Sequence, residues 1–288
     1  MKSLQLLGIG LVLLLGLTAV SAQSPGAQVA LTLERTACFG SCPIYTVAIY
    51  DDGTVVYHGE RFVDVTGEQT SQLEPETVQM MVQAFADAGY FGWDEAYDAM
   101  TVSDLPTVIT SVTRNGEKHQ IVRYMGDNSA PLALPYLEVW LDLMANTAQW
   151  TGTQPDVYGI NLGMESPVAT LERTPCFGFC PTYSVAIYPD GTLVYTGIAN
   201  VERLGVYVLH TEDFVVESLV QQAEIFGYFG WQDAYDQMVM TDQASAITSF
   251  RTETQYKRIT RYGGDPNAPL GLTWLEDSID QLAVDAAS

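Results

Sequence analysis

Positive charge is scarce in this sequence, and the shortage excludes several kinds of partner. The 288 residues include 12 Lys+Arg against 35 Asp+Glu, a formal net charge of −23. A field of this sign repels phosphate backbones and anionic lipid headgroups, so we expect neither nucleic-acid nor membrane-surface binding. The charge favours solubility, cations and basic partners, although solvation of the surface alone also accounts for it.

Long apolar runs are equally scarce, since only the N-terminus has one. Lys2 precedes residues 4–20, which are almost wholly apolar, and Val20-Ser21-Ala22 resembles a signal-peptide cleavage site. The run is short against the roughly 20 residues that span a bilayer. We therefore expect residues 1–22 to be a cleaved signal peptide. The mature protein is then secreted or periplasmic, without stable membrane insertion.

The strongest pattern is an internal repeat. Displaced by 138 positions, as from Cys38 to Cys176, the sequence matches itself without a gap. The segment LERTACFGSCPIYTVAIYDDGTVVYHG is repeated as LERTPCFGFCPTYSVAIYPDGTLVYTG, and GYFGWDEAYDAM is repeated as GYFGWQDAYDQM. A period this long indicates a duplicated domain, because solenoid repeats have periods of about 20–50 residues. We expect modules at 28–146 and 167–284, joined by a linker at 147–166.

Each module alternates strand and helix signals. In the first copy we expect strands at 30–36, 45–50 and 54–59, with a turn at Asp52-Gly53. A further strand falls within 63–73. A helix begins at Pro75 and ends near Gly89, a hairpin covers 109–124, and a last helix begins at Pro131. The predicted fold class is α+β: two tandem modules, each an antiparallel sheet with about two helices packed mainly on one face.

Four cysteines form two short Cys-x-x-x-Cys loops, Cys38–Cys42 and Cys176–Cys180. An exported chain with an even cysteine count indicates disulfides, and duplication favours pairing within each copy. Redox chemistry is less favoured, because thioredoxin-like sites use Cys-x-x-Cys at a helix start and Pro43 here leads into a strand. A zinc site would require the two loops to meet. We predict structural disulfides and neither a metal nor a cofactor.

Only three histidines are present, and none is kept between the copies. His58 corresponds to Thr196, His119 to Lys257, and His210 to Gln72. A histidine-based triad or metal site shared by both modules is therefore excluded, although a site in one copy remains open. The known nucleotide-binding, hydrolase and calcium-binding motifs are also missing. We assign no catalytic residue.

Arginines kept in both copies are the other candidates in so acidic a chain. Arg35 and Arg123 match Arg173 and Arg261, and the predicted partners Asp98 and Asp104 match Asp236 and Asp242. These residues are interpreted either as structural ion pairs or as a carboxylate-binding site beside aromatics such as Tyr45, Trp93 and Tyr97. Other carboxylates kept in both copies include, in the first, Glu34, Asp52, Glu74, Glu138 and Asp142.

The segment Cys-Phe-Gly-x-Cys-Pro-x-Tyr, followed by an apolar strand, Asp-Gly-Thr, Val-x-Tyr and Gly, resembles the bacterial domain-of-unknown-function family 6438. The resemblance covers both modules. It implies an exported α+β domain and brings no activity, and the tandem form suggests avidity or a composite interface. Our first hypothesis is a non-catalytic protein that binds a protein partner or small ligand through two copies. The alternatives are a carboxylate hydrolase, within a module or in the cleft between modules, and a thiol–disulfide protein.

Overall fold

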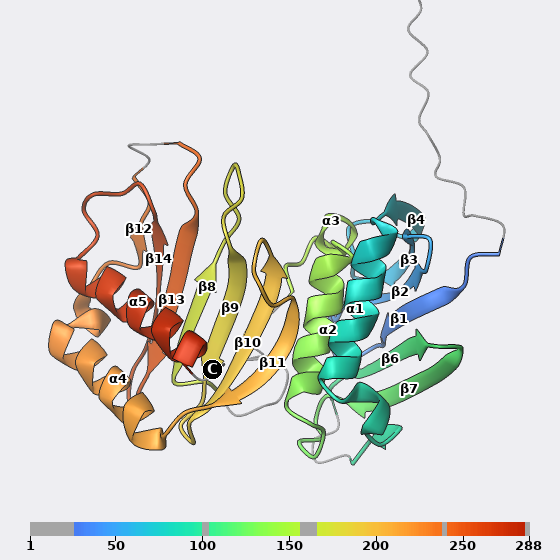
Figure 1. Cartoon of the computed structure of the whole chain (residues 1–288), viewed down its shortest axis with the longest axis horizontal. Coiled ribbons are helices and arrows are strands. Elements are labelled where there is room, and N and C mark those ends of the chain that lie inside the picture. The colour runs from blue at the N-terminus through green and yellow to red at the C-terminus, as the bar shows by residue number, and fades with distance from the viewer. Residues whose placement is uncertain (1–25, 100–103, 156–165, 238–240, 286–288) are drawn as a thin grey trace, which may run out of the picture.

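The computed structural model describes residues 26–99, 104–155, 166–237 and 241–285 (Figure 1). The predicted signal peptide lies outside these residues. Among the described residues, no helix has the length and apolar character needed to cross a membrane. The strands and helices fall into two modules in chain order, each built on one seven-stranded sheet.

The first sheet contains seven strands: β1 (Val29–Arg35), β2 (Ile44–Tyr50), β3 (Thr54–Arg61), β4 (Gly67–Gln72), β5 (Ala96–Tyr97), β6 (Thr107–Arg114) and β7 (Glu117–Tyr124). Their spatial order is β4-β3-β2-β1-β6-β7-β5. All neighbours are antiparallel except β5 and β7. The expected mostly antiparallel α+β fold is confirmed.

The second sheet repeats this arrangement with β8 (Ala169–Arg173), β9 (Thr182–Ile187), β10 (Thr192–Ala199), β11 (Gly205–His210), β12 (Ala234–Tyr235), β13 (Ser245–Arg251) and β14 (Tyr256–Tyr262). The order is again β11-β10-β9-β8-β13-β14-β12. The hairpin between β13 and β14 keeps its place although Thr254 replaces the glycine of the first copy. A hydrogen bond from Thr252 N to Gln255 O, 2.9 Å, closes its longer turn.

A glycine is required at the tight turn between β2 and β3. Gly53 has φ of +88°, and a Cβ there would lie 2.0 Å from the backbone oxygen of Leu73. Gly191 occupies the same place in the second module, with φ of +83° and the oxygen of Thr211 at 2.1 Å. Only glycine combines this backbone conformation with so close an approach. The turn therefore explains the repeated Asp-Gly pair.

Two main helices cover one face of each sheet: α1 (Pro75–Asp87) and α2 (Ala133–Met144) in the first module, and α4 (Asp213–Phe226) and α5 (Leu270–Asp285) in the second. Short 3-10 helices, η1 (Tyr90–Gly92) and η2 (Tyr228–Gly230), follow α1 and α4. The spacing of Val78, Met81, Val82 and Phe85 predicts one inward face of α1. Val78, Met81 and Phe85 are buried, and Val82 is partly buried against the same core.

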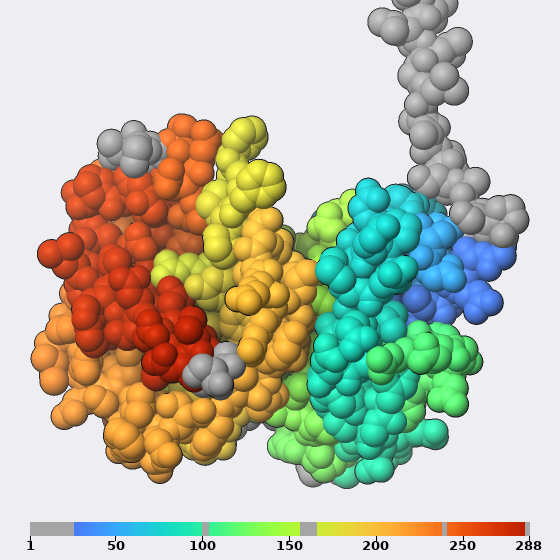
Figure 2. Space-filling model, in the orientation of Figure 1, coloured from blue at the N-terminus to red at the C-terminus, as the bar shows by residue number. Residues whose placement is uncertain are grey.

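The helices of the first module also pack on the second module (Figure 1). α1 and α2 lie between their own sheet and the outer face of β10 and β11, so the chain forms four layers: sheet, helices, sheet, helices. Trp140 Nε1 donates a 2.8 Å hydrogen bond to Gly197 O, and the hydroxyls of Tyr136 and Tyr188 lie 2.7 Å apart. Figure 2 shows the two halves in contact along this line.

This contact is a continuation of the first module's hydrophobic core. Ala186, Tyr188, Val194 and Val206 of the second sheet are buried against the first module's helices. Gly205 lies so close that a Cβ on it would be 2.7 Å from that of Ala84. The repeat pattern did not predict which surfaces of the two modules meet, because it describes each copy by itself.

The first part of the predicted linker also belongs to the first module. Residues of this segment form the short helix α3 (Ala148–Thr151). Trp150 of α3 is 7% exposed and packs into the first core. Residues 156–165, the centre of the predicted linker, are outside the described part of the chain.

Candidate functional site

Each cysteine loop is closed on itself, as the sequence predicts. Cys38 and Cys42 are bonded with Cα atoms 5.8 Å apart, and Cys176 and Cys180 with Cα atoms 5.7 Å apart. Disulfides of this kind are typical of proteins outside the cytoplasm. The loops project from the sheets and carry exposed phenylalanines, Phe39 in the first and Phe177 and Phe179 in the second.

Arg35 lies behind the first loop and binds Asp142 of α2. Its Nη2 and Nε donate to Asp142 Oδ2 at 2.7 and 2.9 Å. Tyr45 donates its hydroxyl to Asp142 Oδ1 at 2.8 Å and accepts from Arg35 Nε at 3.0 Å. The second module repeats the triad with Arg173, Tyr183 and Asp280.

Burial by itself would lower the pKa of Arg35, but the Asp142 carboxylate outweighs this effect and raises it. The pKa of Tyr45 is raised by burial and then by the same carboxylate. The arginine therefore stays protonated and the tyrosine stays neutral, and both act as hydrogen-bond donors at any ordinary pH.

Arg123 makes a second ion pair, deeper in the module. Its side chain and that of Glu138 are only 2% and 1% exposed. Arg123 Nε donates to Glu138 Oε1 at 2.9 Å, and Arg123 Nη2 donates to Glu138 Oε2. Arg261 and Glu276 repeat this pair, and Arg173 Nη1 also reaches Glu276 at 3.2 Å. Because Arg123 is almost fully covered and its guanidinium is committed to Glu138, we interpret it as part of the architecture, although its side chain borders a hollow between the modules.

These pairs correct the partners expected from sequence. Among the described residues, Arg35 pairs with Asp142 and Arg123 pairs with Glu138, in place of the expected Asp98 and Asp104. The backbone oxygen of Asp104 instead accepts a 3.2 Å hydrogen bond from Phe39 N on the cysteine loop. In the second copy the arginines likewise bind Glu276 and Asp280. Asp236 and Asp242 do not take this role, and Asp242 accepts from Thr241 at 3.1 Å.

Sequence reasoning also missed Asp127, which anchors the segment after β5. Asp127 Oδ2 accepts from Ala99 N at 2.8 Å, and Asp265 does the same for Gln237 N at 2.9 Å. The signal was available, because both carboxylates are kept at the repeat spacing. Trp93 and Tyr97, proposed as core or ligand-stacking residues, pack against the first module's core.

An aromatic stack beside the Arg35 triad distinguishes the two modules. In the first, the rings of Tyr45 and Tyr57 lie 5.6 Å apart, and Trp150 stacks on Tyr57 at 4.9 Å with 27° between the planes. Trp150 is held there by a 2.9 Å hydrogen bond from Val65 N to its backbone oxygen. As a result Tyr57 is completely buried.

In the second module the same stack is open. Tyr183 and Tyr195 lie 5.5 Å apart, and Tyr207 extends the row at 6.3 Å. These tyrosines line a cavity of about 480 Å³ together with Arg203, Asp280 and Val284. The three rings are half-buried rather than buried. No tryptophan among the described residues covers Tyr195 as Trp150 covers Tyr57. We refer to this cavity as the tyrosine pocket.

The first module keeps a smaller cavity of about 250 Å³, lined by Arg35, Cys42, Tyr45 and the segment after α3. Burial raises the pKa of Tyr195 to about 12, with a further contribution from Tyr207. Burial likewise raises the pKa of Tyr57 to about 12. The pocket tyrosines are therefore neutral at physiological pH and present apolar ring faces rather than phenolate.

Two further hollows contain charged side chains but are less suited to chemistry. One, about 360 Å³, lies between the modules and contains Asp127 and Asp190. Hydrogen bonds from Ser129 lower the pKa of Asp127, and hydrogen bonding to Thr192 lowers that of Asp190. Each carboxylate accepts hydrogen bonds from residues of its own turn. A general acid requires a raised pKa, whereas the pKa values of these two groups are lowered.

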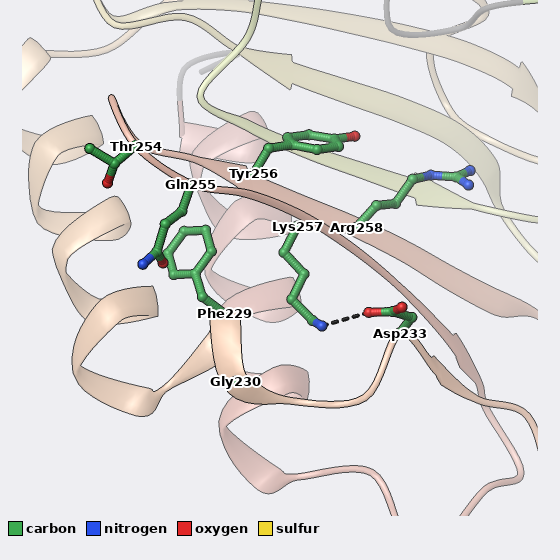
Figure 3. A pocket seen from close by; sticks show the side chains of 8 residues that line it. All are labelled: Phe229, Gly230, Asp233, Thr254, Gln255, Tyr256, Lys257 and Arg258. Carbon is green, nitrogen blue, oxygen red and sulfur yellow. Dashed lines mark hydrogen bonds and ion pairs between the residues drawn. The ribbon is translucent and has the colours of Figure 1, made fainter.

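The other hollow, about 760 Å³, is an open surface of the β13–β14 hairpin (Figure 3). Its lysine is already engaged, because Lys257 Nζ lies 2.6 Å from Asp233 Oδ1. The groups that could ligate a metal do not gather anywhere in the described residues. His119 lies edge-on to Tyr90, with ring centroids 5.4 Å apart.

A family model described as a domain of unknown function, DUF6438, matches residues 29–145 and 167–283. The chain belongs to this family. Each DUF6438 domain corresponds to one sheet with its helices, and the two matches exclude α3, so Trp150 lies outside both. No curated protein matches the chain. The family description assigns no activity.

Proposed function

We propose that this tandem DUF6438 protein is an exported, non-catalytic binding protein whose tyrosine pocket receives a planar aromatic group. One observation carries the proposal: the first module fills the equivalent site with its own tryptophan, stacked on Tyr57. The second module keeps the stack, as Tyr183 and Tyr195, and leaves it accessible. The site is therefore built to accept an aromatic ring, and one of the two copies has it available.

The export part of the proposal draws on the predicted signal peptide and the two disulfides. The binding part replaces the expectation of two equivalent sites with a single open one. A hydrolase has less support, because Asp142, Glu138, Asp280 and Glu276 are all held in ion pairs with arginine.

Titration of the full chain with N-acetyl-tryptophanamide, followed by two-dimensional NMR, tests the proposal. We expect resonances of β9, β10 and β11 to shift, with affinity in the weak range usual for a single ring. Tyr195→Leu removes one stacking partner, which contributes about 0.5–1.5 kcal/mol beyond area burial, so affinity falls roughly two- to tenfold.

Tyr207→Gln provides a milder variant, because Gln69 stands at that position in the first module. The matched control is Tyr256→Leu, which removes an exposed tyrosine outside the pocket. The proposal fails if the wild-type chain does not bind the probe at millimolar concentration. It also fails if Tyr195→Leu binds as well as the control variant.

A further inference from the structure

We infer that the natural occupant of the tyrosine pocket is a polypeptide segment, one helical turn with a hydroxyl side chain followed three residues later by tryptophan. The inference rests on the proposed function and specifies its ligand. It derives from the way α3 occupies the corresponding site of the first module, where the same chain supplies an internal example of the bound state.

The α3 segment makes three kinds of contact in the first module. The Trp150 ring stacks on Tyr57. The hydroxyl of Thr147 donates to Asp142 Oδ1 at 2.9 Å, the oxygen that also accepts from Tyr45. The backbone oxygen of Trp150 accepts from Val65 N at 2.9 Å. The stacking contact with Tyr57 favours an aromatic ring at position 150, and the Asp142 carboxylate favours a hydroxyl at position 147.

A single turn of helix brings these groups to one side. Trp150 N donates to Thr147 O at 2.9 Å, so positions i and i+3 lie above one another. Both side chains are almost fully covered, with Thr147 1% and Trp150 7% exposed. The Thr147 hydroxyl and the Trp150 indole therefore occupy the site together. A free aromatic amino acid would make the stacking contact but not the hydrogen bond to the carboxylate.

The second module keeps the receiving groups. Asp280 accepts from Tyr183 at 2.6 Å and from Arg173 at 2.5 Å, as Asp142 does from Tyr45 and Arg35. The Asp280 side chain is 27% exposed against 2% for Asp142. In the described residues, no hydroxyl corresponding to that of Thr147 reaches Asp280.

The chain does not repeat the occupant itself. At the spacing of the repeat, Thr147 and Trp150 correspond in sequence to Asp285 and Ser288. The receiving side has instead gained aromatic surface, because Tyr207 stands where the first module has Gln69. Arg203 replaces Val65 and lies over the Tyr207 ring, with its guanidinium carbon 5.6 Å from the ring centroid. These changes enlarge the aromatic surface of the tyrosine pocket, on which a ring from another molecule can stack.

The test uses a synthetic peptide with the sequence of residues 145–155, Ala-Asn-Thr-Ala-Gln-Trp-Thr-Gly-Thr-Gln-Pro, blocked at both ends. Binding to the full chain is measured by isothermal titration calorimetry and compared with N-acetyl-tryptophanamide. We expect the peptide to bind at least tenfold more tightly, because it adds the hydroxyl and backbone contacts to the ring.

Two altered peptides separate the contacts without affecting the fold of the protein. The peptide with Trp150→Ala should lose measurable binding, and the one with Thr147→Val should lose about tenfold or more, as expected for a hydrogen bond to a charged group. The Tyr195→Leu chain should bind the unaltered peptide roughly two- to tenfold more weakly than wild type, because it loses the same stacking contact.

The outcomes distinguish the two proposals. If N-acetyl-tryptophanamide binds but the peptide binds no more tightly, or Thr147→Val has no effect, the inference about the ligand is overturned and the aromatic pocket stands. If neither probe binds, the pocket itself is refuted. Equal binding of the peptide to wild type and Tyr195→Leu would place it elsewhere and would also overturn the inference.

Discussion

Replacing Arg123 by methionine tests whether the buried arginines are architectural. Methionine fills much of the same volume but leaves Glu138 without its guanidinium partner, at a position only 1% exposed. Breaking a buried ion pair from one side costs about 3–5 kcal/mol, because the remaining charge is desolvated and uncompensated. That is a large part of the roughly 5–15 kcal/mol that stabilises a typical domain.

The double variant Arg123→Met/Glu138→Leu removes both charges and should recover most of the lost stability. An apolar pair of similar volume is often as stable as the ion pair that it replaces. Urea unfolding followed by circular dichroism gives the free energies for the full double-mutant cycle. The coupling between the two sites should be about 3 kcal/mol or more.

The second module provides a matched control in Arg261→Met. Glu276 retains Arg173 at 3.2 Å, and the Arg261 side chain is 14% exposed. The loss of stability should therefore be clearly smaller than for Arg123→Met. The reasoning is refuted if Arg123→Met costs under about 1 kcal/mol, or if adding Glu138→Leu brings no recovery.

Two further predictions concern pH and the contact between the modules. The pKa values of Tyr57 and Tyr195, about 12 when folded, lie above the value near 10 of an unfolded chain. Their contribution to stability is complete below about pH 10 and is lost as the pH rises toward 12, so urea midpoints should fall as the pH rises through that window. Trp140→Ala should cost about 3–5 kcal/mol and speed amide exchange in β10 and β11, whereas Ser278→Ala, its counterpart in the repeat, should do neither. A midpoint unchanged at high pH, or exchange altered only in the first module, would contradict these expectations.

The pattern of neighbouring residues predicted the strands and helices well, because neighbouring residues determine where each of them forms. Period-two alternation, the Asp-Gly turn and the spacing of Val78, Met81 and Phe85 each depend on neighbouring residues. The disulfide pairing followed from duplication. These features determine the modules, and the structure reproduces them in both copies.

The ion-pair partners depend on how α2 lies over the sheet, and neither periodicity nor composition reports this. Arg35 and Asp142 are 107 residues apart in sequence. Both Glu138 and Asp142 are kept at the repeat spacing, but so are Asp98 and Asp104, and the sequence offered no reason to prefer the helix. The pairing is a property of tertiary packing.

The role of α3 was missed for a different reason. Trp150 lies in a segment rich in Thr, Gly and Pro, which favours a linker. A tryptophan in such a segment was the available signal, since so large an apolar side chain is rarely left in solvent. The repeat offered no help, because Ser288 stands at the position that corresponds to Trp150.

Helices α1 and α2 pack against both sheets. As a result, positions that correspond in the two copies can be buried in one copy and exposed in the other. Val206 and Thr196 are 3% and 2% exposed, whereas their counterparts Glu68 and His58 face solvent. Genetic exchange that made the two halves more alike would place a carboxylate against α1 and α2, where an unpaired charge is strongly disfavoured. Copying the sequence of the first half into the second would therefore weaken the contact between the modules, so the two copies are not interchangeable in this direction.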